Sequence, residues 1–260
     1  MTSSQVSPQV SAQVLARTPQ AAASRYSLLL TTDSDEVLAA QRLRYRVFAD
    51  ELGATVPGGE PGIDADRFDA FCDHLLVRDD TTGEIVGTYR VLPPPRARAA
   101  GELYADGEFD LTVLDPLRPQ MVETGRSCVH PDHRNGAVVG LVWAGLGRYM
   151  VLTGNRWLVG CASVPLADGG VLAASVWDQV RTRHLGPATR RVRPHHPWHG
   201  PAPTRRLPLP PLLRGYLRLG AEVCGPPAHD PDFGCADLLV LLDLQSMDER
   251  YVRFFLDGGR

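Results

Sequence analysis

The sequence lacks the features that mark disulfide-rich, metal-binding and nucleic-acid-binding proteins. Its five cysteines are odd in number and scattered without paired spacing, so neither a disulfide framework nor a zinc-type Cys pair is indicated. We expect reduced thiols, as in a cytoplasmic protein. The formal net charge is only −3, which argues against nucleic acid as the main ligand.

Long apolar runs are also missing. No run approaches the roughly 20 residues that a helix needs to span a bilayer. The first residues lack an apolar stretch of signal-peptide length, and Arg17 is their single basic residue. We therefore expect a soluble, cytoplasmic protein that is at most peripheral to the inner face of the membrane.

The chain is typical of one domain with a full core, because 43% of its 260 residues are hydrophobic and 22% are charged. Residues 1–24 are mostly Ser, Gln, Ala, Pro and Val without sustained periodicity, which predicts a disordered tail. The single domain is then expected over residues 25–260. No internal repeat is visible.

One stretch, residues 121–136, combines a strand, charged side chains and a turn. It carries Glu123 and Arg126, then breaks at Pro131 into a turn rich in His, Arg, Asn and Gly. Residues i and i+3 of an ideal strand point to opposite faces, so these two side chains share a site only if the strand bulges, which Gly125 permits. A strand that leads into a helix N-terminus can hold an anionic or carbonyl-bearing group.

Around this stretch, strand and helix patterns alternate. Further strands are predicted at residues 26–32, 75–79, 84–92, 157–164 and 235–244. Helices are predicted at residues 35–52, 138–153, 171–184 and 207–219, with a final one from Ser246. Residues 81–83 form the turn of the clearest hairpin. This order predicts an α/β fold with a parallel or mixed sheet and helices on its faces.

Helical projection of the first predicted helix defines one buried arc, consisting of Val37, Leu38, Tyr45, Phe48 and Leu52. Arg44 lies at the edge of that arc, whereas Arg42 and Arg46 point away. Arg44 is thus the arginine placed to reach inward. The alternative is a stem that covers apolar surface while the guanidinium stays in water.

Two further segments are rich in charge. One is an acidic segment that ends at His74 and carries Asp64, Asp66, Asp69 and Asp73; such a cluster is usually a solvated turn. The other, residues 190–206, is rich in Arg, His and Pro. It suits an acidic partner or a phosphate-bearing ligand, or it is a solvated linker. Its histidines lack a Cys or carboxylate partner, so we predict no metal site.

Several blocks in order resemble the L-ornithine Nα-acyltransferases, a family of the Gcn5-related N-acyltransferase (GNAT) superfamily. The blocks are residues 43–48, 68–74, 87–93, 125–131, 134–136, 207–220 and 250–255. The resemblance runs from about Tyr26 to Phe255. It implies an α/β (α+β) fold with a GNAT-like mixed, mostly antiparallel central sheet flanked by helices.

The resemblance also implies an activity. Such enzymes transfer a 3-hydroxyacyl chain from acyl carrier protein to the α-amine of ornithine, the first step of ornithine-lipid synthesis. The implied donor is acyl-phosphopantetheine on acyl carrier protein, with no bound cofactor and with peripheral membrane contact as a further expectation. The alternatives are another amine acceptor, coenzyme A as the carrier of the acyl chain, and a non-catalytic module that binds acyl chains or carrier protein.

A more distant resemblance is to the acyl-homoserine-lactone synthases. Their motifs match Arg44 with Phe48, Asp66 to Asp69, Arg90, and Glu123 with Arg126. This implies one shared polar site that also includes His74. The superfamily's coenzyme A loop corresponds to Arg134, Asn135 and Gly136, but Val139 stands where a small residue is usual. A β-branched residue is unfavourable where the backbone must approach a pyrophosphate, which fits a carrier-protein donor.

The expected chemistry is attack of a neutral amine on a thioester, so a base is needed. We predict Glu123 as that base, and the backbone amides around Ser127, Cys128 and Val129 as donors to the oxyanion. A plain structural ion pair of Glu123 with Arg126 is the alternative. Cys128 could also act as an acyl nucleophile, but no His or Lys is evidently paired with it.

The remaining candidates would bind substrate. Arg44, Arg90 and Arg126 are expected to hold the acceptor carboxylate or to order the acidic segment, because guanidinium groups pair with carboxylates in bidentate fashion. Asp66, Asp69 and Asp73 are expected to receive a cationic acceptor side chain.

Overall fold

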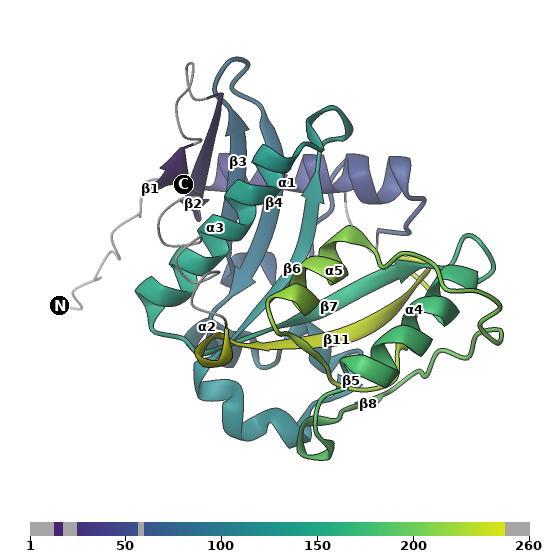
Figure 1. Ribbon diagram of the computed structural model, residues 1–260. Helices are drawn as coiled ribbons and strands as arrows, with labels where there is room; N and C mark the ends of the chain where they lie inside the picture. The colour runs from purple at the N-terminus through teal and green to yellow at the C-terminus, as the bar shows by residue number, and fades with distance from the viewer. Residues whose placement is uncertain (1–12, 18–24, 57–59, 248–260) are drawn as a thin grey trace.

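The protein is built on one large mixed sheet (Figure 1). The structure is a computed structural model and describes residues 13–17, 25–56 and 60–247. The described strands of the sheet are β1 (Gln13–Arg17), β2 (Tyr26–Thr31), β3 (Asp73–Asp79), β4 (Ile85–Leu92), β6 (Met121–Val129), β7 (Trp157–Pro165), β9 (Glu222–Val223), β10 (Ala228–Asp230) and β11 (Cys235–Asp243). Their order is β1-β2-β3-β4-β6-β7-β11-β10, with β9 also paired to β11. Only the β6–β7 pair is parallel, which confirms the predicted mixed, mostly antiparallel sheet.

Helices cover both faces of this sheet. The α-helices are α1 (Ser34–Tyr45), α2 (Pro94–Ala100), α3 (Gly136–Thr153), α4 (Val171–Arg183) and α5 (Pro211–Arg218). The larger hydrophobic core includes residues of α3, α4 and α5. A second core on the other face includes Leu103, Phe109 and Leu114, from the segment between β4 and β6. This segment contains α2, the 3₁₀ helices η3 (Tyr104–Asp106) and η4 (Thr112–Gln120), and β5 (Phe109–Asp110), which pairs with β8 (Arg193–Pro194).

Helix α3 is long and apolar because it packs in the core. With 18 residues it is long and apolar enough to cross a membrane, whereas we expected no apolar run of nearly that length from the sequence. In the structure α3 packs along the sheet (Figure 1), and its buried residues include Val138, Leu146 and Met150 of the larger core. It is therefore a core helix. Its first turn is capped by Asn135 Oδ1, which accepts from the amides of Ala137 and Val138 at 3.1 and 3.2 Å.

Three predicted elements differ from the structure or fall outside it. Strand β1 lies inside residues 1–24, the predicted disordered tail, and pairs with β2. The first helix is α-helical only to Tyr45 and continues as a π-helical turn, η1 (Arg46–Glu51). Ser246, predicted to cap the final helix, is the last residue of a 3₁₀ helix, η7 (Leu244–Ser246); the rest of that predicted helix after Met247, like the resemblance block 250–255, lies outside the described residues. The hairpin β3–β4 is confirmed, with Gly83 at φ 78° in its turn.

Strand β6 bulges, as the spacing of Glu123 and Arg126 requires. Its register with β4 shifts between the pairs Thr88–Cys128 and Arg90–Gly125, so β6 holds one extra residue there. The residue in the left-handed region is Arg126, at φ 53°, and not Gly125 as the sequence suggested. A non-glycine residue in this region is uncommon, and it keeps this strained conformation only where contacts with its surroundings hold it.

Strands β6 and β7 separate soon after they meet. They pair only from Met121–Trp157 to Glu123–Val159. At the last point of contact Gly160 of β7 lies so close to Thr124 of β6 that a Cβ on residue 160 would overlap the carbonyl oxygen of Thr124. Beyond this point the edge of β6 that faces away from β4 has no strand partner in the described part of the chain.

We expect Gly160→Ala to destabilise the protein, because the added methyl must push the two strands apart. Overpacking of this kind lowers the free energy of unfolding by about 1–3 kcal/mol. Denaturant unfolding measures the change. The matched control is Gly140→Ala in α3, where a Cβ meets nothing within 4 Å and the helix should gain roughly 0.5–1 kcal/mol. Equal stability of the two variants would contradict this account of the strand contact.

Candidate active site

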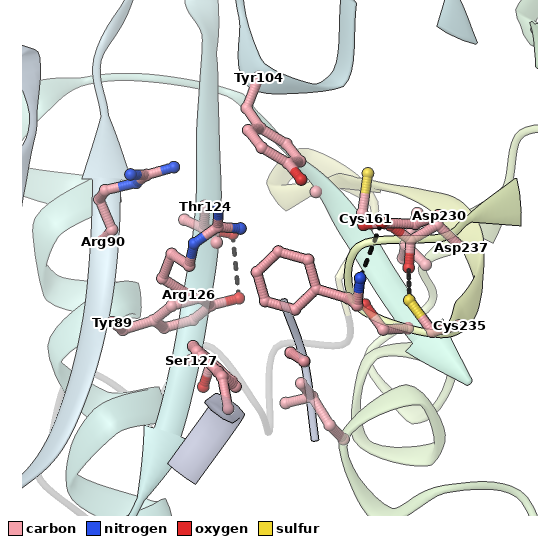
Figure 2. A pocket seen from close by; sticks show the side chains of 18 of the residues that line it. Tyr89, Arg90, Tyr104, Thr124, Arg126, Ser127, Cys161, Asp230, Cys235 and Asp237 are labelled. Carbon is pink, nitrogen blue, oxygen red and sulfur yellow. Dashed lines mark hydrogen bonds between the residues drawn. The ribbon is translucent and has the colours of Figure 1, made fainter. Parts of the chain in front are cut away.

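A cavity of about 730 Å³ lies where β6 and β7 separate. Residues of both hydrophobic cores line it, so the cavity opens to both faces of the sheet. On the side of α5 the lining is mainly apolar and includes Leu158, Val240, Leu242, Leu212 and Tyr216. On the other side it is polar and includes Glu123. The same side includes Arg90, Tyr104, Arg126, Cys161, Asp230 and Asp237 (Figure 2). We call these two regions the apolar end and the polar end of the cavity.

Glu123 is held by the backbone of η3. Its two carboxylate oxygens accept hydrogen bonds from the amides of Tyr104 and Ala105, at 2.7 and 2.8 Å. The side chain is nearly buried but lines the cavity. Burial raises the pKa of Glu123 to about 7, although the two amide hydrogen bonds oppose the shift. A carboxylate has about four acceptor positions, so these bonds leave Glu123 free to accept a further proton.

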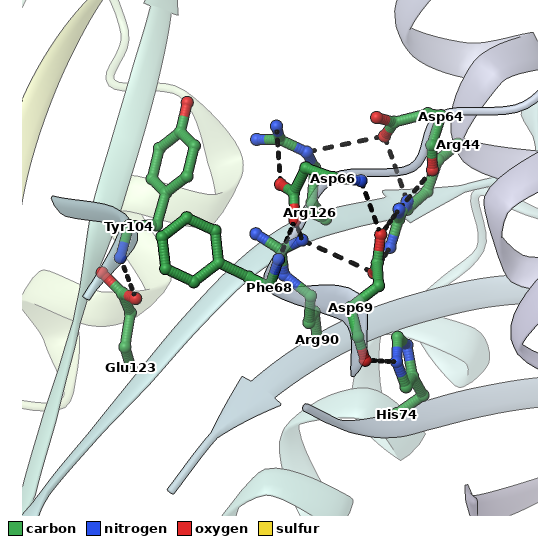
Figure 3. A network of polar contacts seen from close by, with 10 residues as sticks. All are labelled: Arg44, Asp64, Asp66, Phe68, Asp69, His74, Arg90, Tyr104, Glu123 and Arg126. Atoms are coloured by element: carbon green, nitrogen blue, oxygen red, sulfur yellow. Dashed lines mark hydrogen bonds and ion pairs between the residues drawn. The ribbon is translucent and has the colours of Figure 1, made fainter. Parts of the chain in front are cut away.

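Beside Glu123, three arginines and three aspartates form one buried network (Figure 3). Arg44 donates to both carboxylate oxygens of Asp69 at 2.8 Å and, through Nε, to Asp64 at 3.0 Å. Arg90 donates to Asp66 at 2.5 Å, and Arg126 lies 3.3 Å from the other oxygen of Asp66. The formal charges balance, which is the condition for burying so many ions.

Asp69 is the centre of this network. Burial alone would raise its pKa, but the Arg44 guanidinium holds the pKa well below its usual range. Arg90 also lies 3.5 Å from Asp69. His74 lies behind it, with Nε2 3.3 Å from the carbonyl oxygen of Asp69, and burial lowers the pKa of His74.

The structure brings most of the predicted substrate residues together. Arg44 is fully buried, as predicted, but the predicted buried arc is wrong: the buried residues of α1 are Ala40, Leu43 and Arg44, and Leu52 of the predicted arc is 59% exposed. Phe48 lines the cavity and packs edge-to-face on Phe233, with ring centroids 5.7 Å apart. Asp73 does not join the network: it faces away, accepts from the Tyr149 hydroxyl at 2.7 Å and pairs with Arg96 at 2.9 Å.

The three residues after the bulge face different ways. Ser127 lines the cavity. Cys128 is buried on the other side of β6, in a small core with Leu43 and Val47, and burial raises the pKa of its thiol to about 12. Val129 is half-buried against the larger core. Only the backbone of Cys128, and not its thiol, is thus near the chemistry that the cavity can support.

The loop between β6 and α3 is tied down by its own side chains. Arg134 makes a bidentate ion pair with Glu51 of η1, both contacts being 2.6 Å, and its Nε donates to the carbonyl oxygen of Val129 at 3.1 Å. Asn135 is occupied as the cap of α3, and Gly136 is the first residue of that helix. Val139 is 42% exposed in the first turn of α3.

Several residues of the cavity were not predicted. Tyr104 lies in a segment for which the sequence predicted no helix or strand. Tyr89, Thr124 and Tyr216 form a hydrogen-bonded chain in the cavity wall, in which the hydroxyls of Tyr89 and Thr124 are 3.0 Å apart. In the sequence, only the alternation of inward and outward residues along β4 and β6 indicated where Tyr89 and Thr124 point, and nothing indicated Tyr216.

A third unpredicted group lies at the polar end, where Asp230, Cys235 and Asp237 gather. Their ligand atoms lie within 4.8 Å of one another, a spacing at which a cation could be held. All three residues line the cavity.

The chain is similar to known acyltransferases. The family model described as acetyltransferase (GNAT) domain matches residues 43–144. The chain is 37% identical over 251 residues to the L-ornithine N(alpha)-acyltransferase of Rhodobacter capsulatus, covering 90% of this chain and 96% of that protein. It is 36% identical over 250 residues to the protein of the same name from Rhizobium meliloti, covering 89% and 84%.

Solved structures share the fold. A CoA-dependent acyl-homoserine lactone synthase superposes with a TM-score of 0.53 at 16% identity, covering 86% of this chain and 82% of that one. An N-acyl amino acid synthase from uncultured soil microbes gives a TM-score of 0.54 at 12% identity, covering 85% and 92%. The sequence relatives are more specific, and they remove the non-catalytic alternative. The chain belongs to the L-ornithine N(alpha)-acyltransferase family of GNAT proteins and is an amide-forming acyltransferase.

Proposed function

We propose that this enzyme moves a 3-hydroxyacyl chain from the phosphopantetheine thioester of acyl carrier protein to the α-amine of ornithine, giving lyso-ornithine lipid. The two-ended cavity is the observation that carries the proposal. Its apolar end suits an acyl chain, and its polar end, which includes Glu123, suits an amino acid. The names of the curated relatives support ornithine as the acceptor.

The reaction removes one proton from the attacking amine and adds one proton to the departing sulfur. The amine nitrogen attacks the thioester carbonyl carbon, the C–N bond forms and the C–S bond breaks. Glu123 takes the proton from the neutral amine, directly or through a water, and then gives it to the released thiolate, which restores the carboxylate. A base with a pKa of about 7 is well matched to neutral pH.

The backbone of β6 can stabilise the oxyanion that forms during attack. The amide of His130 donates to the carbonyl oxygen of Val86 in β4 at 2.8 Å. Since successive amides of a regular strand point to opposite edges, the amide of Val129 points to the edge that faces the gap, whereas Ser127 lies within the bulge, where this alternation is interrupted. We assign the amide of Val129 as an oxyanion donor, with that of Ser127, which lines the cavity, as the second candidate; such a role is worth about 2.7–4 kcal/mol per donor in other enzymes.

The arginine network would hold and orient the acceptor. Arg90 and Arg126 line the cavity and can bind the carboxylate of the acceptor. Arg44, Asp69 and His74 are too deeply buried to touch it. We assign these three to holding Arg90, Arg126 and Asp66 in place.

The loop before α3 favours a carrier-protein donor over free coenzyme A. The Arg134 guanidinium is engaged with Glu51, and the exposed Val139 stands in the first helical turn, where a pyrophosphate would need close approach to backbone amides. A phosphopantetheine arm tethered to a protein has no such pyrophosphate.

Product analysis tests the proposal. Purified protein is incubated with 3-hydroxyacyl carrier protein, or with the matching acyl-coenzyme A, and a panel of amino acids and polyamines, and products are identified by mass spectrometry. We expect N-acyl-ornithine from the carrier-protein donor. Turnover of another amine would replace the acceptor assignment, and efficient use of coenzyme A would replace the donor assignment.

We further propose that the enzyme acts at the cytoplasmic face of the membrane, where a lipid product can leave. Leu52 and Leu212 are 59% and 37% exposed and both line the cavity, so apolar surface continues from the acyl end to the outside. A flotation assay with liposomes tests this. Absence of association with and without substrate would remove the membrane assignment.

Cys128 should be dispensable for catalysis. Its thiol is buried on the opposite side of β6 and its pKa is raised to about 12, so it is a poor nucleophile. We expect Cys128→Ala to retain more than half of kcat/KM, because the substitution removes only a thiol that packs in a small core. A loss of a hundredfold or more at unchanged Tm would show a covalent acyl-cysteine route instead.

A further inference from the structure

Two carboxylates at the polar end of the cavity lack a cationic partner. Asp230 of β10 and Asp237 of β11 are 5% and 2% exposed. Asp230 accepts from the amide of Phe233 at 3.0 Å, and Asp237 accepts from the Cys235 thiol at 3.3 Å. Within residues 13–17, 25–56 and 60–247, no Arg or His forms an ion pair with either carboxylate.

This differs from the acidic segment of the network. Asp64, Asp66 and Asp69 are each paired with an arginine, so none of them is available to a cationic ligand. Burying unpaired carboxylates is costly. Burial, together with the nearby Asp230, raises the pKa of Asp237, although a hydrogen bond from Ser163 opposes the shift. Glu108, which is close to both, has a pKa raised to about 7 by burial and by these two neighbours. A bound cation would offset this repulsion.

A second, independent feature faces the same space. The Arg126 side chain is only 10% exposed. Its Nε lies 3.5 Å from Asp64 and its Nη2 lies 3.3 Å from Asp66, so these two atoms face the arginine network. Its guanidinium lies between the rings of Tyr104 and Phe233, 4.9 and 4.6 Å from their centroids. Figure 2 shows Arg126 reaching from β6 into the cavity, with Asp230 and Asp237 on the opposite side. The polar end thus presents a guanidinium on one side and two carboxylates without an ion-pair partner on the other, which complements the carboxylate and the cationic side chain of a diamino acid.

The strand register gives the spacing. Val159 of β7 pairs with Glu123, and Ser163 pairs with Asp237. The two positions are therefore four residues apart along the strands, roughly 13 Å, and two strands apart across the sheet, roughly 10 Å. Both carboxyl groups help to raise the pKa of the Cys161 thiol of β7, so both face the space around that residue. Cys161 lines the cavity between the two positions.

We propose that Asp230 and Asp237 bind the side-chain ammonium of the acceptor and so select a diamino acid over a neutral one. This inference rests on the proposed function and deepens it. It assigns to these two residues the role that the sequence suggested for Asp66, Asp69 and Asp73.

The test compares ornithine with norvaline, which has the same carbon chain without the second amine. In Asp237→Asn the ratio of kcat/KM for ornithine to that for norvaline should fall roughly 10- to 100-fold, the range expected for loss of a charge-assisted contact. Asp230→Asn should lower the same ratio, and serves if Asp237→Asn fails to fold. The matched control is Asp232→Asn, which removes an exposed carboxylate from the same turn and should leave the ratio unchanged.

The outcomes separate the two proposals. If the wild-type enzyme acylates no ornithine, the proposed function fails. If it does, but both variants keep the wild-type ratio, only the present inference is overturned. It is equally overturned if removal of divalent metal by EDTA abolishes activity and a metal ion restores it in the wild type but not in Asp237→Asn, since the cluster would then be a metal site.

Discussion

Replacing Glu123 by glutamine is expected to lower kcat/KM by about a hundredfold to ten-thousandfold, the usual contribution of a general base. Glutamine has nearly the same shape but cannot accept the proton of the attacking amine. Its amide oxygen can still accept from the amide of Tyr104 or Ala105, which hold Glu123 in the wild type. Steady-state kinetics with saturating donor measures the effect, and an unchanged Tm shows that the fold is retained.

The same variant also tests whether Glu123 causes the pH dependence of kcat/KM. Because burial raises the pKa of Glu123 to about 7, the carboxyl is protonated below that pH and cannot act as a base. The wild-type kcat/KM should therefore rise about tenfold per unit as the pH increases toward 7, and this step should be missing in Glu123→Gln. The acceptor amine titrates equally in both enzymes, so the difference between the two profiles isolates Glu123. Parallel profiles would mean that Glu123 only ties β6 to η3.

The features that the sequence predicted are those that short stretches of the chain determine by themselves. The hairpin β3–β4 and the strand-turn-helix from β6 to α3 follow from periodicity and turn residues within short windows. Arg44 was predicted to point inward and is fully buried, but the helical projection gave the wrong buried arc, because the chain leaves the α-helix for a π-helical turn after Tyr45. Family motifs then indicated that Arg44, Asp69 and Arg90 share one site, and the structure brings them together.

What the sequence could not predict depends on contacts between distant segments. Asp237 lies 114 residues after Glu123 and reaches the same cavity only because β11 pairs with β7. The amides that hold Glu123 belong to a short 3₁₀ helix without a pattern of its own. The bulge was expected, but its strained position falls on Arg126. The ion pairs of that side chain with Asp64 and Asp66, and its contacts with two aromatic rings, hold the conformation.

The arginine network gives the largest expected effect on stability. Arg44→Met leaves Asp69 and Asp64 buried with reduced compensation, because Arg44 makes the shortest contacts to Asp69 and Arg90 remains only at 3.5 Å. Removing one member of a buried ion pair costs about 3–5 kcal/mol, and denaturant unfolding should show a loss of this size. Arg44→Lys keeps the charge but loses the bidentate geometry, so an intermediate loss is expected.

The pH dependence of this loss distinguishes an ionic cause from a packing defect. In the wild type the pKa of Asp69 is held well below its usual range, so its contribution to stability is present above about pH 4 and is lost as the pH falls toward the folded-state pKa. The difference in unfolding free energy between the wild type and Arg44→Met should therefore narrow below about pH 4. The control Arg42→Met removes an exposed arginine from the same helix and should change stability by less than about 0.5 kcal/mol. A loss in Arg44→Met that is the same at pH 3 and pH 7 would instead point to the methionine packing poorly, with the charges contributing little.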